Sequence, residues 1–155
     1  MRAVLTRVKS ASVVIDGKVN GKIGRGFLIL LGVGPEDTER ECKYLAEKAL
    51  GLRIFTDEND KMNLGLADVG GEVLVVSQFT LYGNCRKGRR PSFTDAAGPE
   101  LGTAMYEKFL SICEELGYPP QHGQFGADMK VESINDGPVA LILDTDQLMD
   151  TPRRK

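Results

Sequence analysis

Apolar and polar positions alternate in short runs along this chain, and the runs indicate β-structure interrupted by two helices. Asp16-Gly17 is a turn signal, so residues 1–33 suggest a β-meander. Strands are predicted over residues 2–8, 12–16, 26–33, 52–55, 72–81, 125–133 and 138–143.

Two segments have the spacing of amphipathic helices. Thr38 and Glu41 have the arrangement of a capping box, and the apolar positions after them predict a helix over residues 38–51. Pro99 and Gly117 suit the first position and the C-cap of a second helix. Its expected buried side chains are Leu101, Met105, Phe109, Ile112, Cys113 and Leu116.

Two further segments lack periodicity and are predicted to be loops. Residues 56–71 are rich in Asp, Asn and Gly, and residues 83–98 combine Gly and Pro with four basic residues. The second segment is long for a connection inside a domain, and loops of that length are often functional.

The order of these elements argues for an α/β protein with mixed, largely antiparallel β-sheets and two main helices. With 155 residues, 41% of them hydrophobic, the chain fits a single compact domain over residues 1–150. Residues 151–155 are expected to form a frayed tail.

The composition of the chain argues against some classes of binding partner. The formal net charge of −2 gives no general attraction to nucleic acid or to an acidic membrane, so we expect no DNA or membrane partner. The longest fully apolar run is far shorter than the roughly 20 residues of a membrane helix. Three cysteines without CxxC spacing, and no signal-like segment before them, predict a reduced, cytoplasmic protein.

The usual catalytic groups are scarce. His122 is the single histidine and lies in a Pro- and Gly-rich stretch, which favours a solvated loop residue over a catalytic base. There is no zinc spacing, P-loop or dinucleotide fingerprint, and an all-carboxylate metal site, which these observations leave open, has no motif behind it. Cys85 has neighbouring cations that favour the thiolate, but it has no paired base in the sequence.

Residues 75–93 are the most informative stretch because a strand leads there into a basic loop. The cations Arg86, Lys87, Arg89 and Arg90 suit contacts with phosphates, although a solvated charge run is equally compatible with them. Ser77, Gln78, Phe79 and Thr80 place polar groups at the end of an apolar strand. Such groups either satisfy edge hydrogen bonds or hold an oxyanion beside a cleft.

Several motifs together resemble the D-aminoacyl-tRNA deacylase family, also called D-tyrosyl-tRNA deacylase. They begin with MRAVLTRV at the N-terminus, run in order, and cover the chain to about Asp144. The others are LRIFTDENDKMNLGL, SQFTLYG, RKGRRPSF, QFGADM and NDGPV.

The resemblance implies a deacylase-like fold and hydrolysis of the ester that joins a D-amino acid to the terminal adenosine of tRNA. It also implies a homodimer with the active site at the subunit interface and no metal or organic cofactor. Ser77 to Leu81 would line one side of the pocket. Gly137 and Pro138, joined by a cis bond, would enter from the partner subunit and exclude L-amino acids.

The resemblance suggests further roles that the residues alone leave open. Arg7 would fix the Gly-Pro element, although a solvated strand arginine is an alternative. Phe125 and Met129 are candidates for the terminal adenosine pocket, although either could be a core residue. Ala140 stands where the family commonly has threonine, so a mechanism that needs that hydroxyl does not suit this chain.

An activated ester needs mainly a positioned water and a stabilised oxyanion. We therefore expect backbone N–H groups around Gln78 and Phe79 to bind the carbonyl oxygen, while the tRNA 2′-hydroxyl helps to organise water. A site that selects by exclusion would accept esters of D-amino acids and also of achiral glycine, such as glycine wrongly attached to tRNA-Ala. The alternatives are a non-catalytic tRNA- or RNA-binding module and a thioesterase that depends on Cys85.

Overall fold

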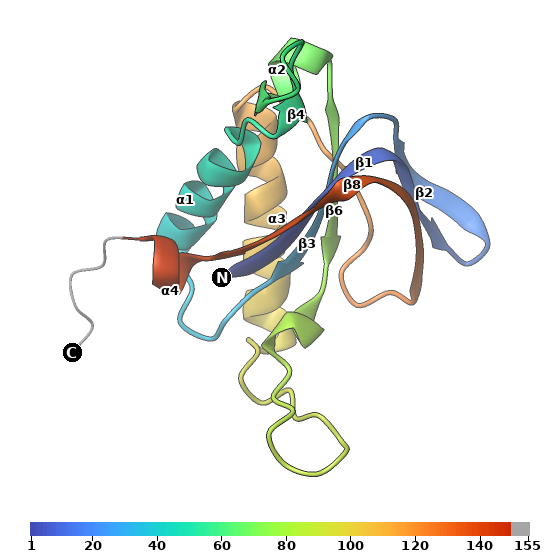
Figure 1. Ribbon diagram of the computed structural model, residues 1–155. Helices are drawn as coiled ribbons and strands as arrows, with labels where there is room; N and C mark the ends of the chain where they lie inside the picture. The colour runs from blue at the N-terminus through green and yellow to red at the C-terminus, as the bar shows by residue number, and fades with distance from the viewer. Residues whose placement is uncertain (150–155) are drawn as a thin grey trace.

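The computed structural model describes residues 1–149, which form a mixed sheet with helices packed on one face (Figure 1). The expected tail at residues 151–155 lies outside the described residues. In chain order the elements are β1 (Arg2–Ile15), β2 (Lys18–Ile23), β3 (Gly26–Gly32), α1 (Glu39–Leu50), β4 (Phe55–Thr56), β5 (Met62–Leu64), α2 (Leu66–Val69), β6 (Glu72–Ser77), the 3-10 helix η1 (Phe79–Tyr82), α3 (Pro99–Glu115), β7 (Gln121–His122), β8 (Met129–Asp144) and α4 (Thr145–Leu148).

The main sheet has the order β2-β1-β3-β6-β7. Strand β3 pairs with the first half of β1 and β2 with its second half, whereas β8 pairs with β1 along its length. Pairings of β1 with β2, β3 and β8 are antiparallel, whereas β3-β6 and β6-β7 are parallel. The predicted fold class, mixed and largely antiparallel with two long helices, is therefore confirmed.

The predicted meander is wrong, because β3 pairs with the first half of β1 and not with β2. The two predicted strands at the N-terminus are one strand of 14 residues. Arg7 and Val8 are consecutive and both buried, and register shifts on either side of Val8 let the alternation resume at Ala11. The hairpin strand β2 escaped prediction because most of its side chains are polar and exposed.

Other predicted segments also differ from the structure. The strand predicted over residues 72–81 ends at Ser77, where the chain turns into η1. The segment at 52–55 contributes only Phe55 to a strand, and the predicted loop at 56–71 contains β5 and α2. The strands predicted over residues 125–133 and 138–143 form one 16-residue strand, β8, which begins at Met129 and contains Asn135 to Pro138.

Both long helices form as the sequence predicts. In α1, the side chain of Glu41 accepts the Thr38 N–H at 2.8 Å and completes a capping box. Partial burial works to raise the pKa of Glu41, but the hydrogen bonds from Thr38 outweigh it and the pKa is lowered. In α3, Pro99 occupies the start and Gly117 follows the end, at a φ of 96°.

Burial along α3 differs in part from the prediction. Phe109, Ile112 and Cys113 are buried, whereas Leu116 caps the helix end and is 39% exposed. Leu101 and Met105 are half-buried, since Gly102 and Tyr106 face the core instead.

The main hydrophobic core fills the space between α1, α3 and the sheet, and a smaller core lies on the opposite face of the sheet. This second core contains Val8, Ala11, Val13, Ile23, Leu28, Leu74 and Val76.

Among residues 1–149, none of the helices combines the length and apolar character that crossing a membrane requires.

Candidate active site

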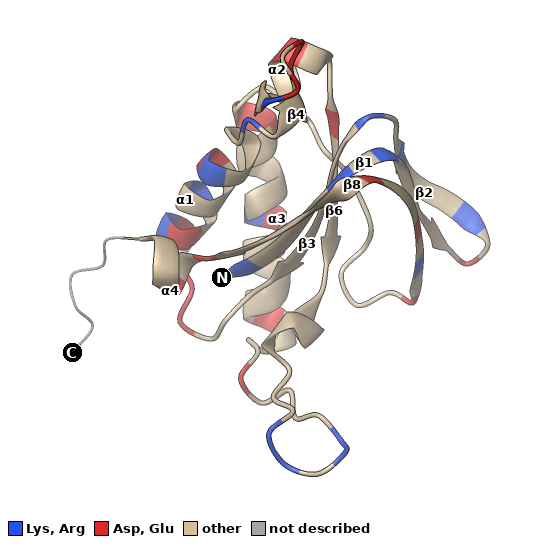
Figure 2. Ribbon diagram, viewed as in Figure 1, with Lys and Arg blue, Asp and Glu red and all other residues tan. Residues whose placement is uncertain are grey.

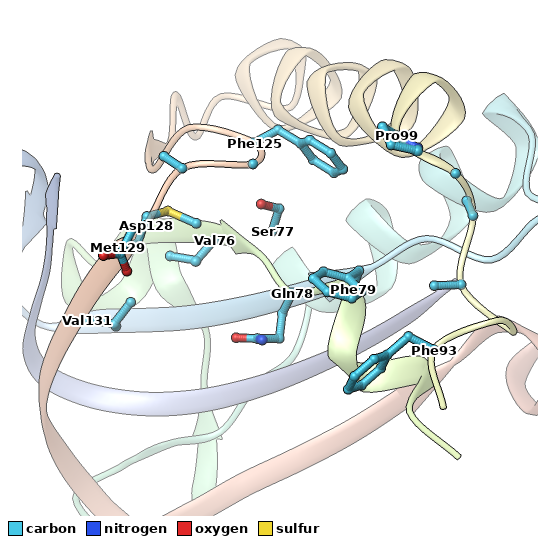
Figure 3. Close-up of a pocket in the computed structure, with 15 residues that line it drawn as sticks. Val76, Ser77, Gln78, Phe79, Phe93, Pro99, Phe125, Asp128, Met129 and Val131 are labelled. Carbon is cyan, nitrogen blue, oxygen red and sulfur yellow. The ribbon is translucent and has the colours of Figure 1, made fainter. Parts of the chain in front are cut away.

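A cavity of about 830 Å³ opens where β6 ends, beside the chain that precedes α3 and the segment that leads into β8 (Figure 3). Ser77, Gln78 and Phe79 line it from the strand end. Phe125 and Met129 line it from the β8 side. Five of the residues singled out in the sequence, from segments about 50 residues apart, therefore meet at one cavity.

Hydrogen bonds explain why the strand ends at this point. The Gln78 N–H donates to the Leu31 carbonyl at 2.7 Å, as the last bond between β6 and its parallel neighbour β3. The Leu81 N–H then donates to the Gln78 carbonyl at 3.2 Å and closes the first turn of η1. This turn leaves the Phe79 side chain 51% exposed at the edge of the cavity.

These bonds correct one expectation about the backbone donors. Because the Gln78 N–H is already paired within the sheet, it is not free to bind an oxyanion. The first N–H groups of a 3-10 helix have no carbonyl acceptor within that helix, which leaves the N–H groups of Phe79 and Thr80 as the candidate donors. The Gln78 amide donates to the Thr80 hydroxyl at 2.5 Å, so Thr80 supports the cavity wall without lining it.

The opposite wall rests on α3. A Cβ atom at Gly102 would lie 2.8 Å from the Phe125 ring, so a glycine there lets the ring pack against the helix. The ring centroid of Tyr106 lies 6.2 Å from that of Phe125. The Tyr106 hydroxyl donates to the Val75 carbonyl at 2.8 Å, and burial raises the pKa of Tyr106, which keeps this donor protonated. Phe125 thus packs against the core and lines the cavity at once.

Sequence reasoning missed several lining residues. Phe93 lies at the mouth of the cavity, Asp128 and Val131 flank Met129, and Ala96 to Pro99 complete the wall before α3. Phe93 ends the RKGRRPSF motif, so its place in that motif was a usable signal.

Arg7, Gly137 and Pro138 lie outside the cavity lining. The Gly137-Pro138 bond is cis, and both residues are exposed on β8. Arg7 is 8% exposed, so it is not a solvated strand arginine. Its Nε donates to the Asp136 carbonyl at 2.8 Å, and its Nη1 donates to the Ile54 carbonyl at 2.6 Å. Ala140, also exposed, pairs with Thr6 on β1.

The basic loop extends away from the cavity, and Figure 2 shows its cations in blue at the far end of the molecule. Arg86, Lys87, Arg89 and Arg90 are exposed, and none of them lines the cavity. Paired backbone hydrogen bonds between Asn84 and Ser92, at 2.7 and 2.9 Å, tie the neck of the loop.

The remaining reactive groups lie elsewhere. Cys85 is exposed in the basic loop, whereas burial raises the pKa of Cys42 and of Cys113 to about 12. His122 lies in β7, with Nδ1 2.6 Å from the Gly123 carbonyl, and is not part of the cavity wall. Residues 1–149 contain no group of His, Cys, Asp and Glu side chains suited to a metal ion.

The fold is shared with solved structures of two proteins. One, titled "c-Myc DNA Unwinding Element Binding Protein", has a TM-score of 0.87 and 40% identity, over 93% of this chain and 98% of that chain. The other, titled "Structural Analysis of a probable eukaryotic D-amino acid tRNA deacylase", has a TM-score of 0.78 over 92% of this chain and 97% of that chain. At 18% identity, the second likeness concerns the fold alone.

The sequence is more specific than the fold. The model of the D-Tyr-tRNA(Tyr) deacylase family matches residues 4–144, and the chain belongs to this family. It is 59% identical to the D-aminoacyl-tRNA deacylase of Desulfatibacillum aliphaticivorans, over 94% of this chain and 99% of the relative. It is 54% identical to that of Thermotoga petrophila, over 96% and 99%. The predictions of family, fold and enzyme class are confirmed.

Proposed function

We propose that the protein hydrolyses the ester bond of D-aminoacyl-tRNA and releases the free D-amino acid and tRNA. The observation that carries this proposal is the cavity in which Ser77, Gln78 and Phe79 face Phe125 and Met129, in a member of this family. Its volume of about 830 Å³ lies within the range of roughly 300 to 1,000 Å³ that ligand sites occupy.

The cavity suits a reaction that needs little nucleophilic chemistry. The ester of an aminoacyl-tRNA is activated, so the enzyme must mainly orient a water molecule and stabilise the developing oxyanion. The N–H groups of Phe79 and Thr80, at the start of η1, are the proposed donors to that oxyanion, because the Gln78 N–H is paired with Leu31. The 2′-hydroxyl of the terminal ribose would help to hold the attacking water, and Ser77 would line its approach.

The terminal adenosine is proposed to bind between Phe125 and Met129. Both side chains are half-buried and line the cavity, and the Phe125 ring is fixed by its packing on α3. An aromatic ring with a flexible thioether opposite suits the flat face of a purine base.

Chiral selection is proposed to involve a second copy of the chain. Gly137 and Pro138 are exposed and lie outside the cavity of their own chain, so they would reach a cavity only in a neighbouring subunit. The same strand exposes Ile134 by 61% and Ile142 by 77%. Exposed apolar side chains gathered on one strand favour a protein interface, which supports a homodimer with its active site at that interface.

In this arrangement the Gly137-Pro138 backbone lies near the α-carbon of the substrate and collides with an L-side chain. Esters of D-amino acids and of achiral glycine fit the site, so tRNA-Ala that wrongly carries glycine would be a further substrate. Arg7 fixes the segment through its hydrogen bond to Asp136. Ala140 supplies no hydroxyl, so the selection rests on the backbone before it.

The exposed cations of the basic loop would contact tRNA phosphates, in the cytoplasm where aminoacylated tRNA is used.

An assay of ester hydrolysis separates the proposed deacylase from a non-catalytic RNA-binding module. Release of D-tyrosine from D-tyrosyl-tRNA by the purified protein supports a deacylase, whereas salt-dependent tRNA binding without release contradicts it. A thioesterase that depends on Cys85 is disfavoured, because Cys85 lies outside the cavity lining.

A further inference from the structure

Phe79 and Phe93 form an exposed aromatic pair at the mouth of the cavity. Their ring centroids are 5.3 Å apart and the rings are inclined by 72°, an edge-to-face arrangement. Phe79 is 51% exposed and Phe93 is 37% exposed, although both are large apolar side chains. In the view of Figure 3, Phe79 lies between Phe125 and Phe93, so the pair lies beyond the proposed adenosine site.

The backbone holds Phe93 in this position. A Cβ atom at Gly83 would lie 3.0 Å from Cε1 of Phe93, so the ring packs closely over the glycine that ends η1. The Ala97 N–H donates to the Val33 carbonyl at 2.9 Å and ties the chain after Phe93 to the end of β3. The aromatic pair is thus attached to the sheet.

The same segment connects the pair to the basic loop. Asn84 and Ser92 close the neck of that loop immediately before Phe93, and the exposed cations follow on the other side of the neck. The aromatic pair therefore lies between the cavity and the neck of the basic loop. Aromatic rings beside a basic surface are the usual means of binding single-stranded nucleic acid, in which bases stack on the rings and cations follow the phosphates.

We propose that Phe93, together with Phe79, is a stacking subsite for the nucleobase that precedes the terminal adenosine of the tRNA. The subsite rests on the proposed function, since it lies between the cavity that would bind that adenosine and the loop that would meet the phosphates. Every base has a π-face, so the subsite recognises an unpaired 3′ end and not a particular sequence.

Two esters test the subsite: D-tyrosyl-adenosine, which has no preceding base, and the D-tyrosyl ester of the trinucleotide CCA. Phe93→Ala should lower kcat/KM for the trinucleotide ester about 5- to 150-fold more than for the nucleoside ester, the range expected for one stacked base. Phe93→Trp should restore the preference for the longer ester, while Phe93→Leu, apolar but without a π-face, should not.

Val19→Ala is the matched control, because Val19 is 61% exposed on β2 and lies outside the cavity. It should leave the ratio of the two rates unchanged. Equal losses of Phe93→Ala on both esters would contradict the subsite and make Phe93 a wall of the catalytic cavity. A change in the mass of the protein assembly caused by Phe93→Ala would also overturn the subsite, because the aromatic pair would then be covered by a second copy of the chain.

Binding of the non-acylated CCA trinucleotide separates the subsite from the proposed function. If the unaltered protein hydrolyses neither ester, the proposed deacylase activity fails. In that case the subsite is still supported if Phe93→Ala weakens the binding of the trinucleotide more than the binding of adenosine, by the factor expected above for the two esters. Equal affinity of Phe93→Ala and the unaltered protein for the trinucleotide would overturn the subsite in either case.

Discussion

The guanidinium of Arg7 binds the carbonyl oxygen of Asp136, across 129 residues of sequence, through a 2.8 Å hydrogen bond from Nε. Asp136 Oδ2 lies 3.6 Å from the same nitrogen, so a charge interaction supports the bond. Through its other hydrogen bond, to Ile54, Arg7 fixes the residue before Gly137 relative to the body of the domain.

Arg7→Met should therefore loosen the segment that is proposed to exclude L-amino acids. We expect the free energy of unfolding to fall by about 1.5 to 3 kcal/mol, the usual worth of a hydrogen bond to a charged group. The ratio of L- to D-tyrosyl-tRNA hydrolysis should rise. Urea unfolding and parallel ester assays measure the two effects. Arg53→Met, at an exposed arginine, is the control, and unchanged selectivity in Arg7→Met would contradict the role given to Arg7.

Gln78→Ala and Thr80→Ala should slow hydrolysis of D-tyrosyl-tRNA only moderately. Each substitution removes one side-chain hydrogen bond beside the cavity and leaves the backbone donor in place. A loss of about 2- to 10-fold in kcat is expected, equivalent to roughly 0.5 to 1.5 kcal/mol. Thr80→Ser keeps the hydroxyl and should retain the rate. Complete inactivity of either alanine variant would instead indicate a side-chain nucleophile or base.

Replacing the four loop cations, Arg86, Lys87, Arg89 and Arg90, by alanine should weaken tRNA binding. Each lost phosphate contact should reduce the slope of log affinity against log salt by about 1. Measurements of KM at several salt concentrations give this slope. The double variant Lys18→Ala and Lys22→Ala, at exposed cations of β2, should leave the slope unchanged. An unaltered slope in the loop variant would mean that these cations are merely solvated.

Sequence patterns predicted the local elements better than their partners. The capping residues Thr38 and Glu41 act within a few positions of each other, so the start of α1 could be located from sequence. The pairing of β3 with the first half of β1 is possible because β1 is one strand of 14 residues whose second half pairs with β2, which no local pattern indicates. The Gly137-Pro138 pair has the composition of a turn, yet the pairing of Asn135 with Val8 and of Ala140 with Thr6, on either side of it, holds it inside a strand.

The meeting of residues at the cavity was predictable where a motif carried it. SQFT and QFGADM marked Ser77, Gln78, Phe79, Phe125 and Met129 as candidates for one site, because the resemblance joins segments that are distant in sequence, and these residues line one cavity. Phe93 was missed because an isolated aromatic residue in a loop shows neither burial nor neighbours in a linear pattern. The pairing of the Gln78 N–H with Leu31 was also hidden, since it depends on the sheet order.

Ile142→Asp should separate the proposed homodimer. Ile142 is 77% exposed on β8, and a carboxylate there would face the partner across an apolar interface, at a large desolvation cost. Analytical ultracentrifugation should show a monomer, and chiral selection should fail because the second copy of Gly137-Pro138 is absent. Val19→Asp, at an exposed apolar position on β2, should remain dimeric. A monomeric Ile142→Asp protein with intact selection would contradict a shared active site.

Hydrolysis of D-tyrosyl-, L-tyrosyl- and glycyl-tRNA by the purified protein, measured side by side at equal concentrations, tests the central claim most directly. The account predicts rapid release of D-tyrosine, detectable release of achiral glycine and no release of L-tyrosine above the uncatalysed rate. Equal turnover of the D- and L-tyrosyl esters would contradict selection by the Gly137-Pro138 backbone.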